Sequence, residues 1–244
     1  MPAAGETAKT RRPRSRRGDG GRLRAEIIDA AREILADAGG PEGLTLRGVA
    51  RRVGIAATSI YLHFPDTEHL AVAATEQTFA DLTAAAAAAA AGISDPGEAL
   101  LARCRAYCHF GLEHPGHYRV MFNQELLPSL AANPEDTPGR RAFQVLVQAV
   151  EACQAAGVAT ATGDPFRLAS LVWAAEHGLV SLRLSRPQFP WSDIDSLVDE
   201  AITGIMGLRR TPADPRRQPT PAHADRPAAS LTPASPPENW SAGR

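Results

Sequence analysis

One stretch, Thr45–Leu70, limits what this chain can fold into more than any other: TLRGVARRVGIAATSIYLHFPDTEHL. Thr45 suits the start of a helix, because its hydroxyl can accept a hydrogen bond from a free backbone N–H group. Apolar residues recur at helical spacing over 46–53, and Gly54 then tolerates the left-handed conformation that ends a helix. A second helix is expected over 57–64. The stretch therefore predicts a helix-turn-helix, whose second helix can enter a DNA major groove.

The charge of the chain is unevenly distributed, although its formal net charge is −1. Residues 1–64 carry twelve Lys or Arg and seven Asp or Glu, a net of +5, whereas residues 65–244 have a net of −6. The basic part coincides with the helix-turn-helix, as expected if only that part meets phosphate. Three cysteines are too few for a disulfide scaffold, and neither a membrane span nor a secretory leader is recognisable. We therefore expect a cytoplasmic protein with no membrane partner.

The rest of the chain also has helical patterns, so the expected fold class is all-α. A helix over 22–38 supports the two short helices, and together they predict a three-helix DNA-binding domain over 22–67. A helical ligand-binding and dimerisation domain is expected over 68–210. Its helices are expected over 66–91, 96–114, 117–127, 140–156, 165–185 and, capped by Ser192, 193–208, with a loop over 128–138.

Both ends of the chain are predicted to be disordered. Residues 1–21 contain few large apolar residues and form a basic arm. The arm either follows phosphates or a minor groove, or is a solvated leader without a partner. Residues 211–244 contain eight prolines and are expected to be a disordered tail.

The last two helices are apolar on more than one side. Large apolar residues surround most of the helix over 165–185, and the final helix has a stripe through Ile194, Val198 and Ile202. A helix of this kind is covered on two sides. We interpret the pair as half of a four-helix dimer interface, and an ordinary core pair is the alternative.

The order of these elements resembles the TetR family of transcriptional regulators. The resemblance rests on the motif above, preceded by AEIIDAAREILADAG, and is close over about residues 22–70. HPGHYRVMF and WAAEHGL resemble the subgroup with a Trp–His–Gly signature, here Trp173, His177 and Gly178. The resemblance implies a homodimer that binds a palindromic operator in double-stranded DNA, usually as a repressor. It also implies that a small-molecule effector in the C-terminal domain releases the DNA.

The resemblance further implies roles in DNA binding for individual residues. Thr45 and Arg47 would contact phosphates, as would Tyr61 and His63 after the second helix of the motif. The residues that would face base edges are Ala56, Ala57, Thr58 and Ser59. The chain departs from the family at Thr67, where a lysine is frequent, so a phosphate contact there would be neutral and weaker.

Candidates for the wall of a ligand pocket lie in the C-terminal domain: Tyr107, Cys108, Met121, Phe122, Phe143, Trp173 and His177. Such residues at helical spacing are also typical of an ordinary core, so both interpretations stay open. Cys104 and Cys108 lie one helical turn apart. They either bind a metal or sense oxidants, or are buried as small hydrophobic residues.

Three other functions are weighed against a ligand-responsive repressor. The cysteine pair makes a redox- or metal-responsive regulator the alternative, although a clear fourth metal ligand is missing. A helical interaction scaffold would not explain the basic motif. The chain has no phosphate-binding loop, nucleophile elbow or metal-binding helix motif, so we expect neither an enzyme nor a cofactor.

Overall fold

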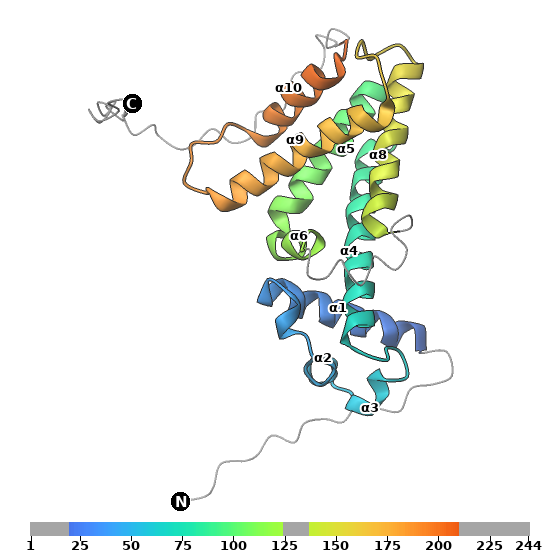
Figure 1. Cartoon of the computed structure of the whole chain (residues 1–244), viewed down its shortest axis with the longest axis vertical. Coiled ribbons are helices and arrows are strands. Elements are labelled where there is room, and N and C mark those ends of the chain that lie inside the picture. Colours follow the sequence, from blue (N-terminus) through green and yellow to red (C-terminus); the bar gives the residue numbers. More distant parts are fainter. Residues whose placement is uncertain (1–19, 124–136, 210–244) are drawn as a thin grey trace, which may run out of the picture. The chain divides into compact units, whose positions relative to one another are not determined.

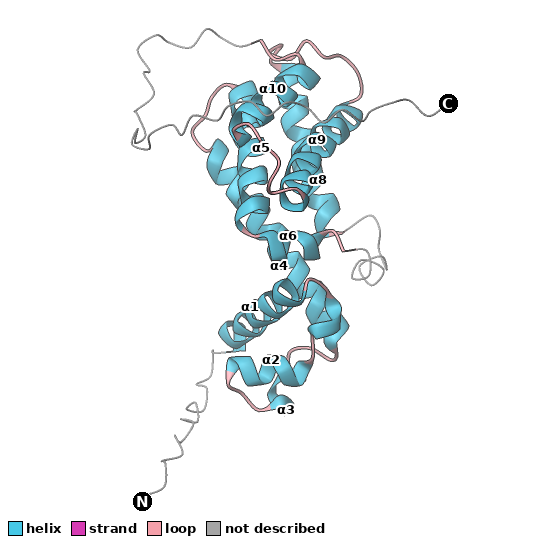
Figure 2. Cartoon of the chain, turned by 90° about the vertical axis from the view of Figure 1, so that its left-hand side faces the viewer, coloured by secondary structure: helices cyan, strands magenta, loops and turns pink. Residues whose placement is uncertain are grey.

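The computed structural model describes residues 20–123 and 137–209. Within these ranges it contains helices and no strand, as Figure 2 shows, which confirms the all-α class. None of the helices described there is both long and apolar enough to cross a membrane. The elements in Figure 1 are α1 (Gly20–Ala38), η1 (Pro41–Gly43), α2 (Leu46–Val53), α3 (Ala57–Ile60), α4 (Thr67–Ala90), α5 (Pro96–Glu113), α6 (Pro115–Met121), α8 (Pro138–Ala155), α9 (Pro165–Ser185) and α10 (Ile194–Met206).

Local chemistry accounts for most of the helix ends. The Thr45 hydroxyl accepts a hydrogen bond of 3.0 Å from the Gly48 N–H group at the start of α2. Gly54 ends α2 in the left-handed region, at a φ of 78°. Side-chain oxygens cap α4, α5, α8, α9 and α10 in the same way, at Asp66, Asp95, Thr137, Asp164 and Asp193. The predicted cap at Thr45 and the predicted turn at Gly54 are confirmed.

Helix α3 is shorter than predicted. It ends at Ile60 rather than Phe64, and the chain continues as a turn in which the Phe64 N–H group donates to the Ile60 oxygen at 2.9 Å. A residue before a proline is disfavoured in the helical conformation, and Pro65 follows Phe64. Phe64 is nevertheless buried, so packing anchors the end of the motif.

Two helix starts differ from the prediction by one or two residues. Helix α1 begins at Gly20 and therefore includes the end of the range expected to be an arm. Asp193, not Ser192, caps α10, because its carboxylate accepts hydrogen bonds from the first turn of the helix. Residues 1–19 and 210–244, which hold nearly all of the predicted arm and tail, lie outside the described residues.

Prolines start two helices at places that the prediction assigned differently. Pro115 opens α6, whereas the prediction used it only as the end of the preceding helix. Pro138 opens α8, two residues earlier than predicted. A proline fits the first turn, because the N–H group that it lacks would have no partner within the helix. Residues 124–136, which include the end of the predicted 117–127 helix and most of the 128–138 loop, lie outside the described residues.

A first hydrophobic core joins α1, α2, α3 and the beginning of α4. Its fully buried members are Ile27, Ala31, Leu35, Val49, Ile60 and Leu70. Arg32 ties α1 to α4, because its guanidinium donates to the Thr78 hydroxyl at 3.2 Å and pairs with Asp81. The three-helix unit is therefore fastened to the long helix that leaves it.

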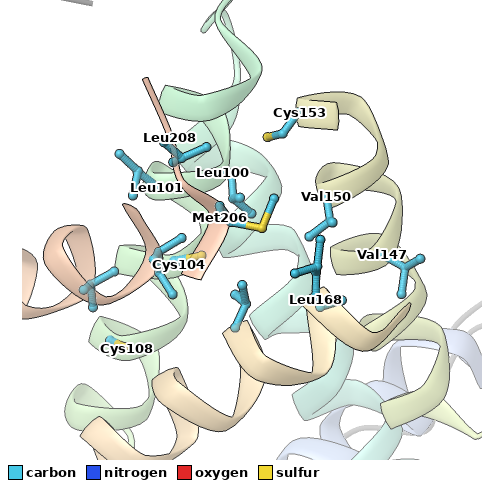
Figure 3. Packing of buried hydrophobic residues seen from close by; sticks show 14 of the residues in the cluster. Leu100, Leu101, Cys104, Cys108, Val147, Val150, Cys153, Leu168, Met206 and Leu208 are labelled. Atoms are coloured by element: carbon cyan, nitrogen blue, oxygen red, sulfur yellow. The ribbon is translucent and has the colours of Figure 1, made fainter. Parts of the chain in front are cut away.

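A second core joins α5, α8, α9 and α10. Figure 3 shows its packing, with labelled side chains Leu100, Leu101, Cys104, Cys108, Val147, Val150, Cys153, Leu168, Met206 and Leu208. Two polar pairs fix α10 on α5. Arg105 holds both carboxylate oxygens of Asp199 at 2.7 Å, and His109 Nε2 lies 2.7 Å from the Asp195 carboxylate.

Helix α6 contributes to both cores. Tyr118 is buried in the second core, and Val120, two residues later, is buried in the first. At Gly116 the backbone of α6 lies so close to α1 that a Cβ atom would be 2.7 Å from the Ala36 carbonyl oxygen. Only glycine fits this contact without a shift of one helix. Helix α6 therefore joins the helix-turn-helix to the helices of the second core.

Candidate functional site

The turn between α2 and α3 holds the two helices at a fixed angle. The Gly54 and Ile55 N–H groups both donate to the Ala50 oxygen, at 2.9 and 3.0 Å. Ile60 is fully buried below α3. With one side of α3 packed on the core, its other side remains available at the surface.

Most of the residues expected to contact DNA share the surface of this motif. Thr45, Arg47, Ala56, Thr58 and Tyr61 are exposed, and Tyr61 keeps 59% of its surface accessible. Ser59 and His63 are half-buried, and Ala57 packs against the first core instead of lying free at the surface.

Leu62 is an exposed residue of this surface that the sequence analysis did not single out. Its side chain is 84% exposed, beside Tyr61. An isolated exposed leucine carries no sequence signal, because single apolar side chains are common on protein surfaces.

A cavity of about 430 Å³ lies among α4, α5, α6, α8 and α9. Five of the seven predicted pocket residues line it: Tyr107, Met121, Phe122, Phe143 and Trp173. Phe79 and Leu82 of α4 and Ala142 and Leu146 of α8 complete much of its apolar wall. The size and lining are typical of a small-molecule site.

The other two predicted pocket residues do not line this cavity. Cys108 is fully buried, with its sulfur 4.0 Å from the backbone oxygen of Glu176. His177 lies behind the wall and is held by hydrogen bonds on both ring nitrogens, with the Tyr118 hydroxyl at Nδ1 and the Ser181 hydroxyl at Nε2. Burial lowers the pKa of His177, so its neutral form is favoured.

A chain of hydrogen bonds runs from the cavity wall into α6. The Trp173 indole N–H donates to the Tyr107 hydroxyl at 3.3 Å, and this hydroxyl lies 2.9 Å from that of Tyr118. The Tyr118 hydroxyl in turn lies 2.7 Å from His177 Nδ1. These hydrogen bonds connect side chains of the cavity wall to α6, the helix that packs on α1.

Glu176 is a polar residue of the cavity wall that the sequence analysis missed. Its side chain is only 3% exposed, and it lines the cavity. Burial raises the pKa of this carboxyl to about 8, and a hydrogen bond from the Cys104 thiol offsets part of the rise. Its sequence signal was a lone acid at helical spacing between Val172 and Val180, in the buried stripe of α9.

The three cysteines lie in the interior. Burial raises the pKa of the Cys104 and Cys108 thiols, and it raises that of Cys153 to about 11. Thiols of this kind are poor nucleophiles and poor redox sensors. Among residues 20–123 and 137–209, no group of three or more His, Cys, Asp or Glu side chains is arranged to hold a metal ion.

Two family models match the chain. Residues 27–74 match the N-terminal model of the bacterial regulatory proteins of the tetR family, and residues 100–205 match a tetracyclin repressor-like C-terminal domain. These ranges contain the helix-turn-helix and most of the cavity wall. Among the curated proteins, none matches this chain.

Solved structures share the fold over most of the chain. A protein of unknown function from Rhodococcus sp. RHA1 has 26% identity and a TM-score of 0.62, with 80% of this chain and 100% of that chain covered. A TetR family transcription regulator from Marinobacter aquaeolei VT8 has 20% identity and a TM-score of 0.60, with 79% and 97% covered. The regulator FadR from Bacillus subtilis, in complex with stearoyl-CoA, has 15% identity and a TM-score of 0.61, with 75% and 97% covered.

The two family models account for the two parts of the molecule that the geometry distinguishes. One part presents a helix-turn-helix, and the other encloses a cavity of ligand size. The chain therefore belongs to the TetR family of ligand-responsive, DNA-binding transcriptional regulators.

Proposed function

We propose that this chain is a repressor that binds a palindromic operator as a homodimer and leaves it when a small apolar molecule fills the cavity. The observation that carries the proposal is the double role of α4 and α6. Both helices line the cavity, and both also pack into the core of the helix-turn-helix unit. A ligand that favours another position of these helices shifts the population of DNA-competent molecules.

We assign the DNA contacts to the exposed side of the motif. Thr45 and Arg47 precede and begin α2, and the Tyr61 hydroxyl projects from the end of α3, so these groups would meet phosphates. Thr58 and Ser59 would read base edges. Two copies of α3 must then reach successive major grooves, about 34 Å apart in B-DNA.

We propose that α9 and α10 pair with the same helices of a second subunit. Leu171 and Leu182 of α9 are 45% and 52% exposed, although both are large and apolar. Gly178 lies between them, and Gly204 on α10 is similar. Within the described residues, a Cβ atom added at either glycine would meet no other atom within 4 Å, which leaves room for close approach by a partner.

The finer classification and the domain limits belong to the same proposal. Trp173 and His177 supply a cavity wall and its support, and this favours the Trp–His–Gly subgroup. We place the DNA-binding domain at residues 22–67 and the regulatory domain at 68–210, while α4 is continuous across the limit.

A binding experiment tests the repressor proposal. Fluorescence anisotropy with labelled DNA from upstream of the protein's own gene is compared with random DNA of equal length, at physiological salt. Specific binding at least about a thousandfold tighter than random binding is expected for a sequence-specific regulator. Equal affinity for both DNAs would contradict the proposal. The affinity should also fall steeply with salt, because phosphate contacts release counterions.

A further inference from the structure

Glu176 lies in the interior, where a carboxyl group lowers the stability of the fold. It lies in the buried stripe of α9 between Val172 and Val180, which are both fully buried. The hydrogen bond that it receives comes from a thiol, a weak donor. A carboxyl taken out of water without a strong partner destabilises the fold. Such a group at the wall of a cavity is a candidate for ligand recognition.

Aromatic rings surround the same cavity. The rings of Phe122 and Phe143 both lie near that of Trp173, with centroid distances of 6.2 and 5.9 Å, and Tyr107 contributes a further ring to the wall. The faces of aromatic rings attract cations, most strongly where water is excluded. A buried carboxyl among several rings is therefore complementary to a positive charge carried on an apolar body.

We propose that the cavity selects an apolar ligand that carries a positively charged nitrogen, a protonated amine or a quaternary ammonium group, and that the Glu176 carboxylate pairs with this charge. This inference rests on the proposed function, because it names the chemical class of the effector. The rings of Tyr107, Phe122 and Trp173 pack around the apolar body and the charged group.

The charged and titratable groups around Glu176 leave this role open to a ligand. Those that line the cavity or interact electrostatically with Glu176 are Arg103, Cys104, Tyr107 and Cys108 of α5, Tyr118 of α6 and Arg140 of α8. Both arginines line the cavity, but among the ion pairs of residues 20–123 and 137–209 neither is joined to Glu176. An incoming cation would therefore give this carboxylate a charged partner.

Proton release is the signature of such a complex. With a pKa of about 8, Glu176 is mostly protonated at neutral pH before the ligand binds. A cation favours the carboxylate, so the proton passes to the solvent as the complex forms. Affinity for the cation should rise about twentyfold from pH 6.5 to pH 8.5 and level off above this pH, because only the ionised form pairs with the ligand.

Three probes with the same ten-carbon chain test the proposal: decyltrimethylammonium, 1-decanol and decanoate. Binding to the full chain is measured by calorimetry in buffers of different ionisation enthalpy, which reports the number of protons released. We expect the cation to bind at least about tenfold more tightly than the alcohol at pH 8.5 and to release close to one proton at pH 7. The alcohol should bind with no proton release.

Glu176→Gln separates the charge from the shape of the cavity. This variant should lose the tenfold preference for the cation and the pH dependence, while its affinity for 1-decanol stays within about twofold, which also shows that the cavity is intact. Glu151→Gln, at an exposed position of α8, is the matched control and should behave as the wild type.

The other possible binding results distinguish a wrong ligand class from a wrong effector site. Tightest binding of decanoate, or a Glu176→Gln variant that keeps its preference for the cation, contradicts the assignment to a cationic ligand. If 1-decanol binds and the cation binds no better, the inference fails but a ligand cavity stands. If none of the three probes binds, the cavity is not the effector site, and both the inference and the effector part of the proposed function fail.

Discussion

The hydroxyl of Tyr118 lies 2.7 Å from Nδ1 of His177, and this contact joins α6 to α9 behind the wall of the cavity. The rings of the two residues also stack, with centroids 5.6 Å apart. Tyr118 is only 2% exposed, so neither water nor a mobile side chain replaces the contact easily. Val120 on the same helix belongs to the core of the helix-turn-helix unit. The hydrogen bond therefore connects the surroundings of the cavity to the DNA-binding unit.

Tyr118→Phe should destabilise the protein without leaving a large void. The substitution removes one hydroxyl, so Tyr107 keeps only the bond from Trp173, and Nδ1 of His177 loses its partner while Nε2 keeps the bond to Ser181. A loss of about 1–3 kcal/mol in the free energy of unfolding is expected, measured by urea denaturation. Ser181→Ala, at the far end of the same hydrogen-bond chain, should lose less than about 1 kcal/mol. Equal losses in the two variants would contradict the central position of Tyr118.

The buried carboxyl of Glu176 should make stability fall as the pH rises. Its pKa is about 8 in the folded protein and near 4.5 when exposed, so between these values the folded state binds more protons than the unfolded state. The part of the folding free energy that depends on this bound proton is fully present below pH 4.5 and is lost as the pH approaches 8. From pH 5.5 to pH 7.5, the wild type should lose about 2 kcal/mol relative to Glu176→Gln, measured by urea unfolding at each pH. Parallel curves for the two proteins would show that the carboxyl is not buried in solution.

Gly54→Ala should weaken the helix-turn-helix. A Cβ atom there meets nothing within 4 Å, so the expected loss comes from the φ of +78° alone. A destabilisation of about 1 kcal/mol is expected by thermal or urea unfolding, together with weaker DNA binding. Gly21→Ala, in the first turn of α1, has the same open surroundings with a helical backbone and should be neutral or slightly stabilising. A similar loss in both variants would exclude backbone strain as the cause.

Substitutions at the tip of the motif should separate affinity from specificity. Tyr61→Ala removes an exposed hydroxyl that we assign to a phosphate, so affinity for operator and for random DNA should fall together, by about fivefold. Thr58→Val or Ser59→Ala should instead change the difference between the binding free energies for operator and random DNA, by about 1–3 kcal/mol. Anisotropy titrations with both DNAs measure these effects. Uniform losses from the Thr58 and Ser59 variants would assign these residues to the backbone.

A charge on the exposed side of α9 should prevent dimer formation. Leu182→Glu places a carboxylate in the proposed interface, and the dimer dissociation constant should rise at least about a hundredfold, because one buried unpaired charge costs several kcal/mol. Analytical ultracentrifugation measures the change. Ile93→Glu alters an apolar residue that is 38% exposed and lies before α5, away from α9 and α10 in the chain, and should leave the dimer intact. A monomeric wild type, or an unaffected Leu182→Glu dimer, contradicts the proposed interface.

Local signals in the sequence were sufficient for most of the fold. Thr45, Gly54 and Asp164 mark helix ends by chemistry that acts within a few residues, and the structure places the ends there. Errors arose where two local rules compete. Phe64 continues the apolar pattern of α3, but the proline after it ends the helix. Pro115 fits the end of one helix as well as the first turn of the next.

The cavity was less accessible to sequence reasoning, because its geometry depends on contacts between distant residues. Aromatic type and helical spacing suggested Tyr107 and Trp173, which line the wall. The same criteria suggested His177, which lies behind it. Phe79 came from a helix interpreted mainly as a connection, and only the packing of α4 on α8 brings it to the cavity. Glu176 was hidden by its apolar neighbours, although a lone acid within a buried stripe is itself a signal.

The contact between Gly116 and Ala36 joins α6 to α1 and involves no residue of the cavity wall. Gly116 meets the carbonyl group and the Cβ atom of Ala36, and neither of these can rotate away, so no side-chain rotation can absorb a displacement of α6 towards α1. The cavity, by contrast, is walled by side chains that can be exchanged one at a time. A descendant of this chain could therefore acquire a different effector through a few substitutions in the cavity wall. The contact by which α6 acts on the helix-turn-helix unit would stay unchanged.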